Sequence, residues 1–165
     1  MDSNERFEEE LGSDKKISFL RKVAKYSKEL IIVPSSVMKI WDTPQGICKF
    51  YPAYKAYIGN DFLRWRKNPV SVNKPWLILS PKFGYIEPEL MISNYNVTFD
   101  DEDTRPITDR DLRIQVKLEK RFERELSSWK KVFVVWNNNS IFFNKVKNSF
   151  EGFDSEVDYY PDNYK

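Results

Sequence analysis

Ser35, Ser36 and Lys39 are the first group of side chains in this sequence that could do chemistry. They lie in the stretch PSSVMK, at the end of the apolar run 30–34. Hydroxyls and free backbone N–H groups after a strand can form an anion-binding nest, and a lysine adds positive charge for a phosphate or carboxylate. The alternative is an ordinary turn in which the serines satisfy backbone groups.

A second group lies in the stretch SPKFG, which follows the apolar run WLIL. Pro81 fixes the chain as it leaves that run, and Gly84 is expected to supply a positive φ or a close backbone approach. Ser80 and Lys82 would then project toward the first segment. A desolvated Lys82 could act as base or nucleophile, whereas the alternative is an exposed surface lysine.

Two further clusters favour structural roles. The four acids of residues 100–103 match no EF-hand spacing, so we expect a solvated loop before a helix and predict no metal site. Residues 137–139 are three consecutive asparagines, which are typical of a helix N-cap. Their amides could alternatively face the edge of a base or sugar.

Histidine is absent from the 165 residues, and Cys48 is the single cysteine. These absences exclude Ser-His-Asp and Cys-His catalysis, histidine-ligated zinc and an internal disulfide within one chain. A catalytic base would have to be a carboxylate, a lysine or a tyrosine. We predict no cofactor and a reducing, cytoplasmic location, since residues 1–10 lack the apolar segment of a signal peptide. The low glycine content with abundant Lys and Glu leans toward a thermophilic source.

Charge is unevenly distributed along the chain. Residues 15–75 contain thirteen Lys and Arg against three acids, whereas residues 1–14 contain one Arg against six acids. A basic half with interleaved tyrosine and tryptophan could hold nucleic acid or a phosphate-bearing small molecule. The alternative is that the lysines solvate the outer faces of two helices.

The apolar runs ELIIVP, PWLILS and KKVFVVW read as buried strands that alternate with helices. We therefore predict a single three-layer α/β domain with a small, mostly parallel sheet of three or four strands, flanked by helices and preceded by an N-terminal helix. The runs are too short to cross a membrane. The expected divisions are an N-terminal helical extension (1–28), the α/β domain (29–150) and an acidic aromatic tail (151–165), which could add an edge strand.

Four helices are expected around these strands. The first starts at Ser13 and has Ile17, Leu20, Ala24 and Tyr26 on one face. The second spans residues 51–65, with Gly59 as a weak point. The third has a capping-box-like start at Thr108 and Asp111, and a stripe of Ile114, Leu118, Phe122 and Leu126. The last follows the asparagines and carries Ile141, Phe142, Val146 and Phe150.

The stretches VPSSVMKIWD, YKAYIGNDF and LILSPKFGYIEPEL resemble an uncharacterised prokaryotic domain family of unknown function. Its members show Pro-Cys-Ser-x-x-Lys and Ser-Ala-Lys-Tyr-Gly motifs, followed by an Asn/Pro-Tyr-Asp step. More distantly, the chain is similar to the YaaA-like peroxide-stress proteins and the core domain of archaeosine synthase, a tRNA-modifying enzyme. The resemblance covers about residues 29–150, and it implies these site residues: Ser35, Ser36, Lys39, Tyr57, Ser80, Lys82, Gly84 and Tyr95.

The sequence departs from the family pattern at reactive positions. Ser35 stands where the family has cysteine, Asn96 replaces an aspartate, and Asn137 and Asn138 replace a glycine pair. The Gly-rich C-terminal segment of the family is also missing. These departures favour binding over transformation.

We therefore expect a non-catalytic or weakly catalytic binding module for a nucleotide, nucleobase or nucleic acid. Its site is expected at the carboxyl ends of the strands, where the segments 35–36, 80–84 and 136–138 emerge. A first alternative is a nucleobase- or tRNA-modifying enzyme that uses Lys39 or Lys82 as nucleophile or base. A second is an accessory protein–protein adaptor, whose basic helices and acidic tail mediate assembly. The sequence favours no particular oligomeric state.

Overall fold

The fold is built on a mixed sheet of five strands in a computed structural model that describes residues 20–44, 46–47 and 49–161. The strand order is β4-β3-β1-β8-β9, and every neighbouring pair is parallel except β3 with β4. The three predicted strands are confirmed, and two more bring the count above the three or four expected. The five strands are β1 (Glu29–Pro34), β3 (Trp76–Ser80), β4 (Gly84–Ile86), β8 (Lys131–Val134) and β9 (Glu156–Tyr159).

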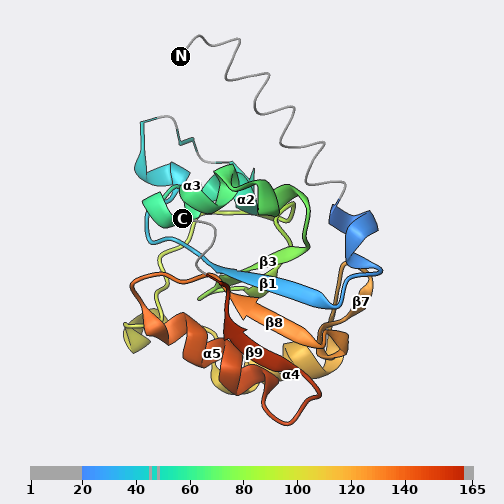
Figure 1. Ribbon diagram of the computed structural model, residues 1–165. Coiled ribbons are helices and arrows are strands. Elements are labelled where there is room, and N and C mark those ends of the chain that lie inside the picture. Colours follow the sequence, from blue (N-terminus) through green and yellow to red (C-terminus); the bar gives the residue numbers. More distant parts are fainter. Residues whose placement is uncertain (1–19, 45, 48, 162–165) are drawn as a thin grey trace.

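Helices cover both faces of this sheet (Figure 1). On one face lie α2 (Ala53–Ala56) and α3 (Asn60–Lys67), and on the other lie α4 (Asp109–Leu118) and α5 (Ser140–Phe150). Side chains that alternate along β1 enter two separate hydrophobic cores. Ile31 and Val33 pack with the α2 and α3 side, whereas Leu30 and Ile32 pack with the α4 and α5 side. The continuous apolar strands are therefore buried on both faces, as a parallel sheet requires.

Short elements complete the described chain. Two small antiparallel pairs, β2 with β5 and β6 with β7, stand outside the main sheet. Their bounds and those of the four 3₁₀ helices are η1 (Ile40–Asp42), β2 (Tyr51–Pro52), η2 (Pro69–Val72), β5 (Met91–Ile92), η3 (Glu102–Thr104), β6 (Lys120–Arg121), β7 (Arg124–Glu125) and η4 (Leu126–Ser128).

The third predicted helix begins where expected but ends early. The Thr108 hydroxyl accepts a hydrogen bond from the Asp111 N–H at 3.1 Å, which confirms the cap. The helix ends at Leu118, which is 69% exposed, and its buried stripe is Leu112 and Val116. The expected stripe was therefore wrong. The chain becomes extended at Glu119, and Phe122 is buried instead in the β6–β7 hairpin, where its φ is 52°.

Two other predicted helices also differ from expectation. The segment 51–65 is divided between α2 and α3, with Gly59 as the N-cap of α3. Of the first helix, residues 20–24 are helical and Leu20 and Ala24 are buried, while Ser13 and Ile17 lie outside the described residues. Tyr26 is 82% exposed rather than on the buried face, because the helix ends before it.

The topology reverses between β1 and β8. From β1 the chain passes through α2 and α3 to β3 on one side, whereas from β8 it passes through α5 to β9 on the other side. Right-handed crossovers in opposite directions put α3 and α5 on opposite faces (Figure 1). A crevice consequently opens between the carboxyl ends of these two strands, where ligands bind in open α/β sheets. Among the described residues, no helix has the length and apolar character needed to cross a membrane.

Candidate functional site

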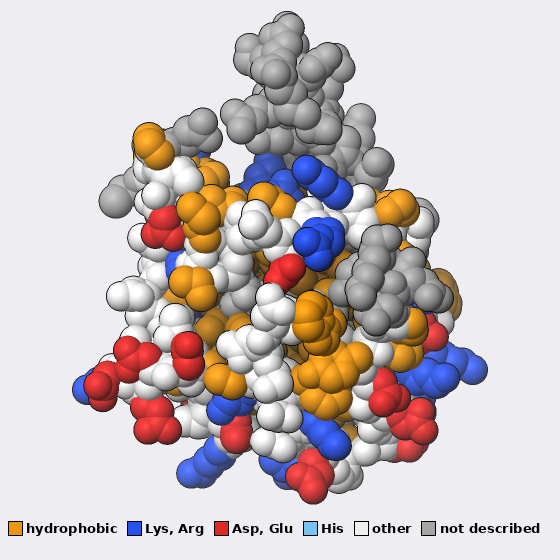
Figure 2. Space-filling view, turned by 60° about the vertical axis from the view of Figure 1, so that its left-hand side comes forward, with side chains coloured by type: hydrophobic (Ala, Val, Ile, Leu, Met, Phe, Trp, Pro, Cys, Tyr) orange, Lys and Arg blue, Asp and Glu red, His pale blue; other side chains and the backbone are white. Residues whose placement is uncertain are grey.

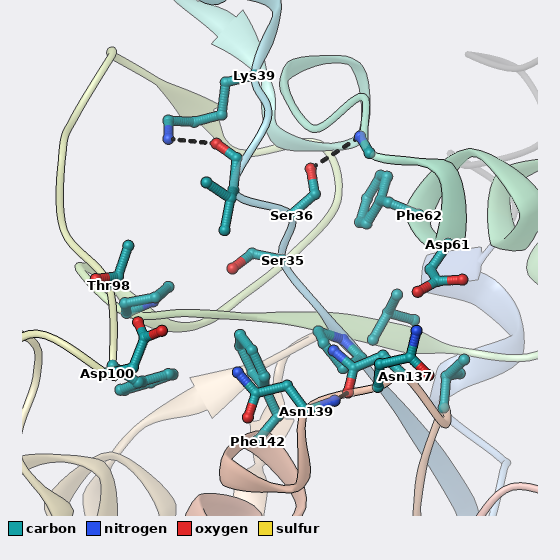
Figure 3. A pocket seen from close by; sticks show the side chains of 18 of the residues that line it. Ser35, Ser36, Lys39, Asp61, Phe62, Thr98, Asp100, Asn137, Asn139 and Phe142 are labelled. Atoms are coloured by element: carbon teal, nitrogen blue, oxygen red, sulfur yellow. Dashed lines mark hydrogen bonds between the residues drawn. The ribbon is translucent and has the colours of Figure 1, made fainter.

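A cavity of about 300 Å³ lies at this reversal (Figure 3). One wall comes from the end of β1 and the loop after it, and another comes from the segment that joins β8 to α5. Its size is at the lower end of the range for small-molecule sites. The cavity is lined by Val33, Pro34, Ser35, Ser36, Val37, Lys39, Gly59, Asn60, Asp61, Phe62, Pro81, Tyr95, Val97, Thr98, Phe99, Asp100, Val135, Trp136, Asn137, Asn138, Asn139 and Phe142.

Ser35 and Ser36 have different roles at this wall. The Ser35 N–H continues the sheet by donating to the Leu79 carbonyl at 3.1 Å, while its side chain faces Tyr95 and opposes the rise in the pKa of that phenol. The Ser36 hydroxyl donates to the Met38 carbonyl at 2.6 Å and accepts from the Gly59 N–H at 3.1 Å. Ser36 therefore stabilises the turn and joins it to the start of α3, as the turn interpretation expected.

Lys39 is a buried cation at the cavity wall, with 7% of its surface exposed. Its Nζ donates to the Val37 carbonyl at 3.1 Å and lies 4.6 Å from the centre of the Tyr95 ring (Figure 3). Burial lowers the pKa of Lys39 from its usual 10.5, and the nearby carboxylate of Asp42 opposes that shift. An ammonium group has three N–H donors. The described residues give this one a single hydrogen-bond acceptor, so donor capacity remains for a ligand.

Tyr95 is the centre of a buried cluster of hydroxyl groups. Its oxygen lies 2.6 Å from that of Tyr57 and accepts a hydrogen bond from Ser80 at 3.1 Å. Burial raises the pKa of Tyr95, while the side chains of Ser80, Tyr57 and Ser35 oppose the rise. Burial also raises the pKa of Tyr57 well above that of a free phenol. Both phenols are therefore neutral at physiological pH, and they hold the cavity wall rather than supply a base.

Five of the eight residues singled out in the sequence converge on another of them, Tyr95. Tyr57 and Ser80 hydrogen-bond to its hydroxyl, Ser35 faces it, and Lys39 and Lys82 approach the face of its ring at 4.6 and 5.9 Å. Lys82 is nevertheless exposed and does not line the cavity, although its neighbour Pro81 does. The segment after β3 therefore supports one wall of the cavity from behind.

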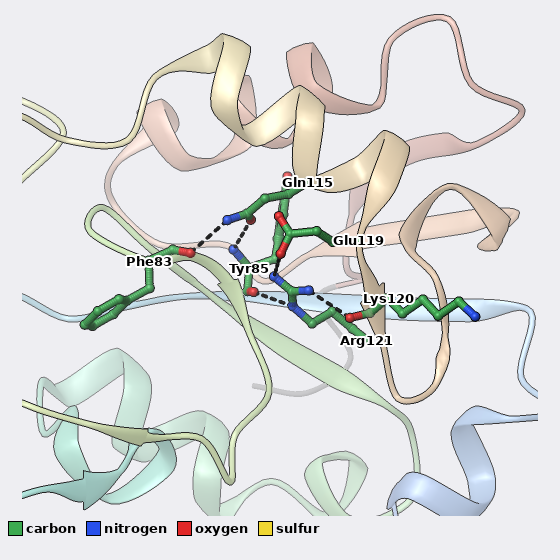
Figure 4. A network of polar contacts seen from close by, with 6 residues as sticks. All are labelled: Phe83, Tyr85, Gln115, Glu119, Lys120 and Arg121. Atoms are coloured by element: carbon green, nitrogen blue, oxygen red, sulfur yellow. Dashed lines mark hydrogen bonds and ion pairs between the residues drawn. The ribbon is translucent and has the colours of Figure 1, made fainter.

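Gly84 lies away from the cavity, in the outermost strand β4. Its φ of +74° is the left-handed conformation expected from the sequence, and a Cβ here would meet the side-chain amide of Gln115 on α4. That amide accepts from the Tyr85 N–H and donates to the Phe83 carbonyl, both at 3.0 Å (Figure 4). Arg121 Nε donates to the Tyr85 carbonyl at 2.7 Å. Gly84 is needed for this closed edge and for no ligand contact.

The start of α5 forms much of the opposite wall. Asn137 Oδ1 accepts from the Asn139 N–H, and Asn139 Oδ1 accepts from the Ile141 N–H, both at 3.0 Å. The predicted N-cap is therefore confirmed. The N-terminus of α3 reaches the same cavity, where Gly59 provides no side-chain cap. Two helix N-termini from opposite faces of the sheet thus direct partial positive charge toward one space.

The acidic segment 100–103 makes local contacts. Asp101 Oδ1 accepts from the Asp103 N–H at 3.0 Å and caps η3, while the exposed Asp100 lines the cavity. Within the part of the chain that the structure describes, no three or more Cys, Asp or Glu side chains gather closely enough to hold a metal ion.

Several cavity residues were not anticipated from the sequence. Asp61 and Phe62 come from the first turn of α3, and Phe142 comes from the start of α5. Trp136 was anticipated, because the segment 136–138 was expected at the carboxyl end of the third strand. Asp61 gave no such signal, because its position depends on how α3 packs.

Comparison with protein-family models, curated proteins and solved structures found no match for this chain. The family resemblance on the two motifs stays a prediction.

Proposed function

We propose that this domain binds a nucleotide in the cavity between the carboxyl ends of β1 and β8. The observation that carries the proposal is the position of the buried Lys39 and Ser35 at the topological reversal of the sheet. Open α/β sheets bind ligands at such reversals, and a buried ammonium with spare donors is a point charge suited to phosphate.

The chemistry of the walls supports a ligand with both an anionic and an aromatic part. Lys39 and the starts of α3 and α5 provide the positive charge. Phe62, Phe99 and Phe142 provide apolar walls, as small-molecule sites usually have. The carboxylates of Asp61 and Asp100 also line the cavity, and they can accept hydrogen bonds from amino or sugar hydroxyl groups.

Calorimetric titration of AMP into the wild-type chain and a Lys39→Met variant tests the proposal. At about 50 mM salt, where phosphate contacts are strongest, the substitution should weaken binding at least about tenfold, as expected for loss of a charged hydrogen bond. Lys82→Met is the matched control, because that lysine is exposed, approaches the same tyrosine ring and does not line the cavity. It should change the affinity less than about twofold.

Equal losses of AMP affinity in Lys39→Met and Lys82→Met would show that binding depends only on the overall positive charge of the protein. An absence of AMP binding by the wild type, with no binding of GMP, CMP or UMP either, would refute the proposal.

A second candidate function is catalysis on a nucleobase with Lys39 as the base. Its burial in the cavity wall and its lowered pKa favour this role over Lys82, which is exposed. Mass-spectrometric screening of nucleosides and nucleotides incubated with the protein would test it. A turnover that persists in Lys82→Met and disappears in Lys39→Met would favour catalysis, whereas unchanged substrates throughout would leave binding alone.

A further inference from the structure

Trp136 differs in its surroundings from the tryptophans of the hydrophobic cores. Trp65, Trp76 and Trp129 are almost completely buried, whereas Trp136 is 47% exposed and lines the cavity. It lies two residues after the end of β8 and precedes the asparagines that lead into α5. A large aromatic side chain that is half in water and half in a cavity wall has a free surface for a ligand.

The cavity brings a buried cation and a half-exposed indole together. Lys39 on one wall is 7% exposed, and Trp136 on the other is 47% exposed. The buried lining also includes Phe62, Phe99 and Phe142, and the exposed lining includes the carboxylates of Asp61 and Asp100. Hydrophobic side chains are exposed near the middle of the face turned forward in Figure 2, with charged side chains around them. A ligand that contacts both Lys39 and Trp136 would therefore place an anionic group against the buried lysine and a flat group against the indole.

We propose that Trp136 stacks on the nucleobase of the bound nucleotide, with the phosphate directed inward to Lys39 and Ser35. This inference rests on the proposed function and adds the orientation of the ligand and the residue that favours a base. Stacking on an aromatic ring tolerates any base, because every base has a π face. The ligand class is therefore a nucleoside monophosphate with little discrimination among bases by Trp136 itself.

The test compares AMP with ribose 5-phosphate, which has the same phosphate and sugar without the base. Wild-type protein should bind AMP about tenfold more tightly, since stacking of one base on an aromatic side chain is worth about 1–3 kcal/mol. In Trp136→Ala this preference should fall to less than about twofold, while the affinity for ribose 5-phosphate stays within about twofold of wild type. Tyr26→Ala is the control, because Tyr26 is an exposed aromatic residue that does not line the cavity.

The outcomes separate this inference from the proposed function. Equal wild-type affinities for AMP and ribose 5-phosphate would overturn the stacking role and leave phosphate binding intact. A Trp136→Ala variant that loses both ligands to the same extent, with an unchanged melting temperature, would overturn it too. Binding of neither ligand by the wild type would refute nucleotide binding itself and this inference with it.

Discussion

Two sets of buried polar groups in this domain differ in how completely they are satisfied. At the edge of β4, the side chain of Gln115 pairs with the backbone of both Phe83 and Tyr85, and Arg121 pairs with the Tyr85 carbonyl. At the carboxyl ends of β1 and β8, Lys39 is more deeply buried than Gln115 and Arg121 but gives one hydrogen bond, to its own loop. Buried polar groups in proteins are normally paired, so the first set closes the fold and the second has capacity for a ligand.

The sequence predicted that the segments after β1 and β3 form one site, but the two segments have different roles in the structure. The segment after β3 contains Gly84, which the β4 edge requires, and Lys82, which does not line the cavity and whose Nζ lies 5.9 Å from the centre of the Tyr95 ring. The segment after β1 contains the lysine that lines the cavity. A lysine or glycine after a strand is therefore informative about function only when the groups that face it are known.

The largest expected effect is on the β4 edge. Gly84→Ala should lower the free energy of unfolding by about 3 kcal/mol, because the positive φ strains alanine and the new methyl group meets the Gln115 amide. Gly152→Ala is the matched control, since its φ is +83° but the nearest atom to a new Cβ lies 3.2 Å away on the flexible Arg113 side chain. Backbone strain alone should lower the free energy of unfolding of Gly152→Ala by about 1 kcal/mol.

Urea denaturation followed by circular dichroism measures both changes. Similar decreases in the free energy of unfolding of the two variants would mean that the contact with Gln115 has no energetic cost. The requirement for glycine at the β4 edge would then come from backbone conformation alone. AMP affinity should be the same as wild type in any fraction of Gly84→Ala that remains folded.

A smaller effect, of opposite sign, is expected at the cavity. Lys39→Met should raise the free energy of unfolding by about 1 kcal/mol near neutral pH while it removes nucleotide affinity, because folding buries an ammonium group without full compensation. The pKa of Lys39 is lower in the folded chain than its usual 10.5, so folding disfavours the protonated form. This cost is fully present below the folded pKa and is relieved as the pH rises through it toward 10.5.

The stability difference between Lys39→Met and wild type should accordingly be larger at about pH 7 than at about pH 10, as urea denaturation at both values can measure. A stability difference that is constant with pH, or a Lys39→Met variant that is less stable than wild type at both values, would indicate that the folded protein already compensates the charge of Lys39. The contrast between the two buried sets would then disappear.

Most of the sheet could be predicted from the sequence because its central strands are continuous apolar runs of the length that buried parallel strands have. The caps at Thr108 and Asn139 could be predicted for a similar reason, since they depend on neighbouring residues alone. The end of α4 could not, because Phe122 and Leu126 continue the four-residue spacing and are buried by a hairpin instead.

The candidate site was predictable in part. The turn after β1 carried recognisable groups, and Ser35 and Lys39 do line the cavity. The segment 136–138 of the opposite wall was also expected at the carboxyl end of a strand. Its pairing with the turn after β1, in place of the segment after β3, could not be predicted, because nothing local in the sequence says that β8 lies beside β1. The role of Gly84 likewise depends on Gln115, which is brought to it by the packing of α4.

The most direct test of the central claim is to map AMP onto the protein by amide NMR shifts. The amides of residues 35–37, 39 and 136–139, which line the cavity, should shift progressively as AMP is added. Those of Phe83 and Tyr85, in the satisfied edge of β4, should stay within the scatter of distant residues. Shifts confined to the β4 edge or spread over exposed lysines, with residues 35–39 unmoved, would contradict the account.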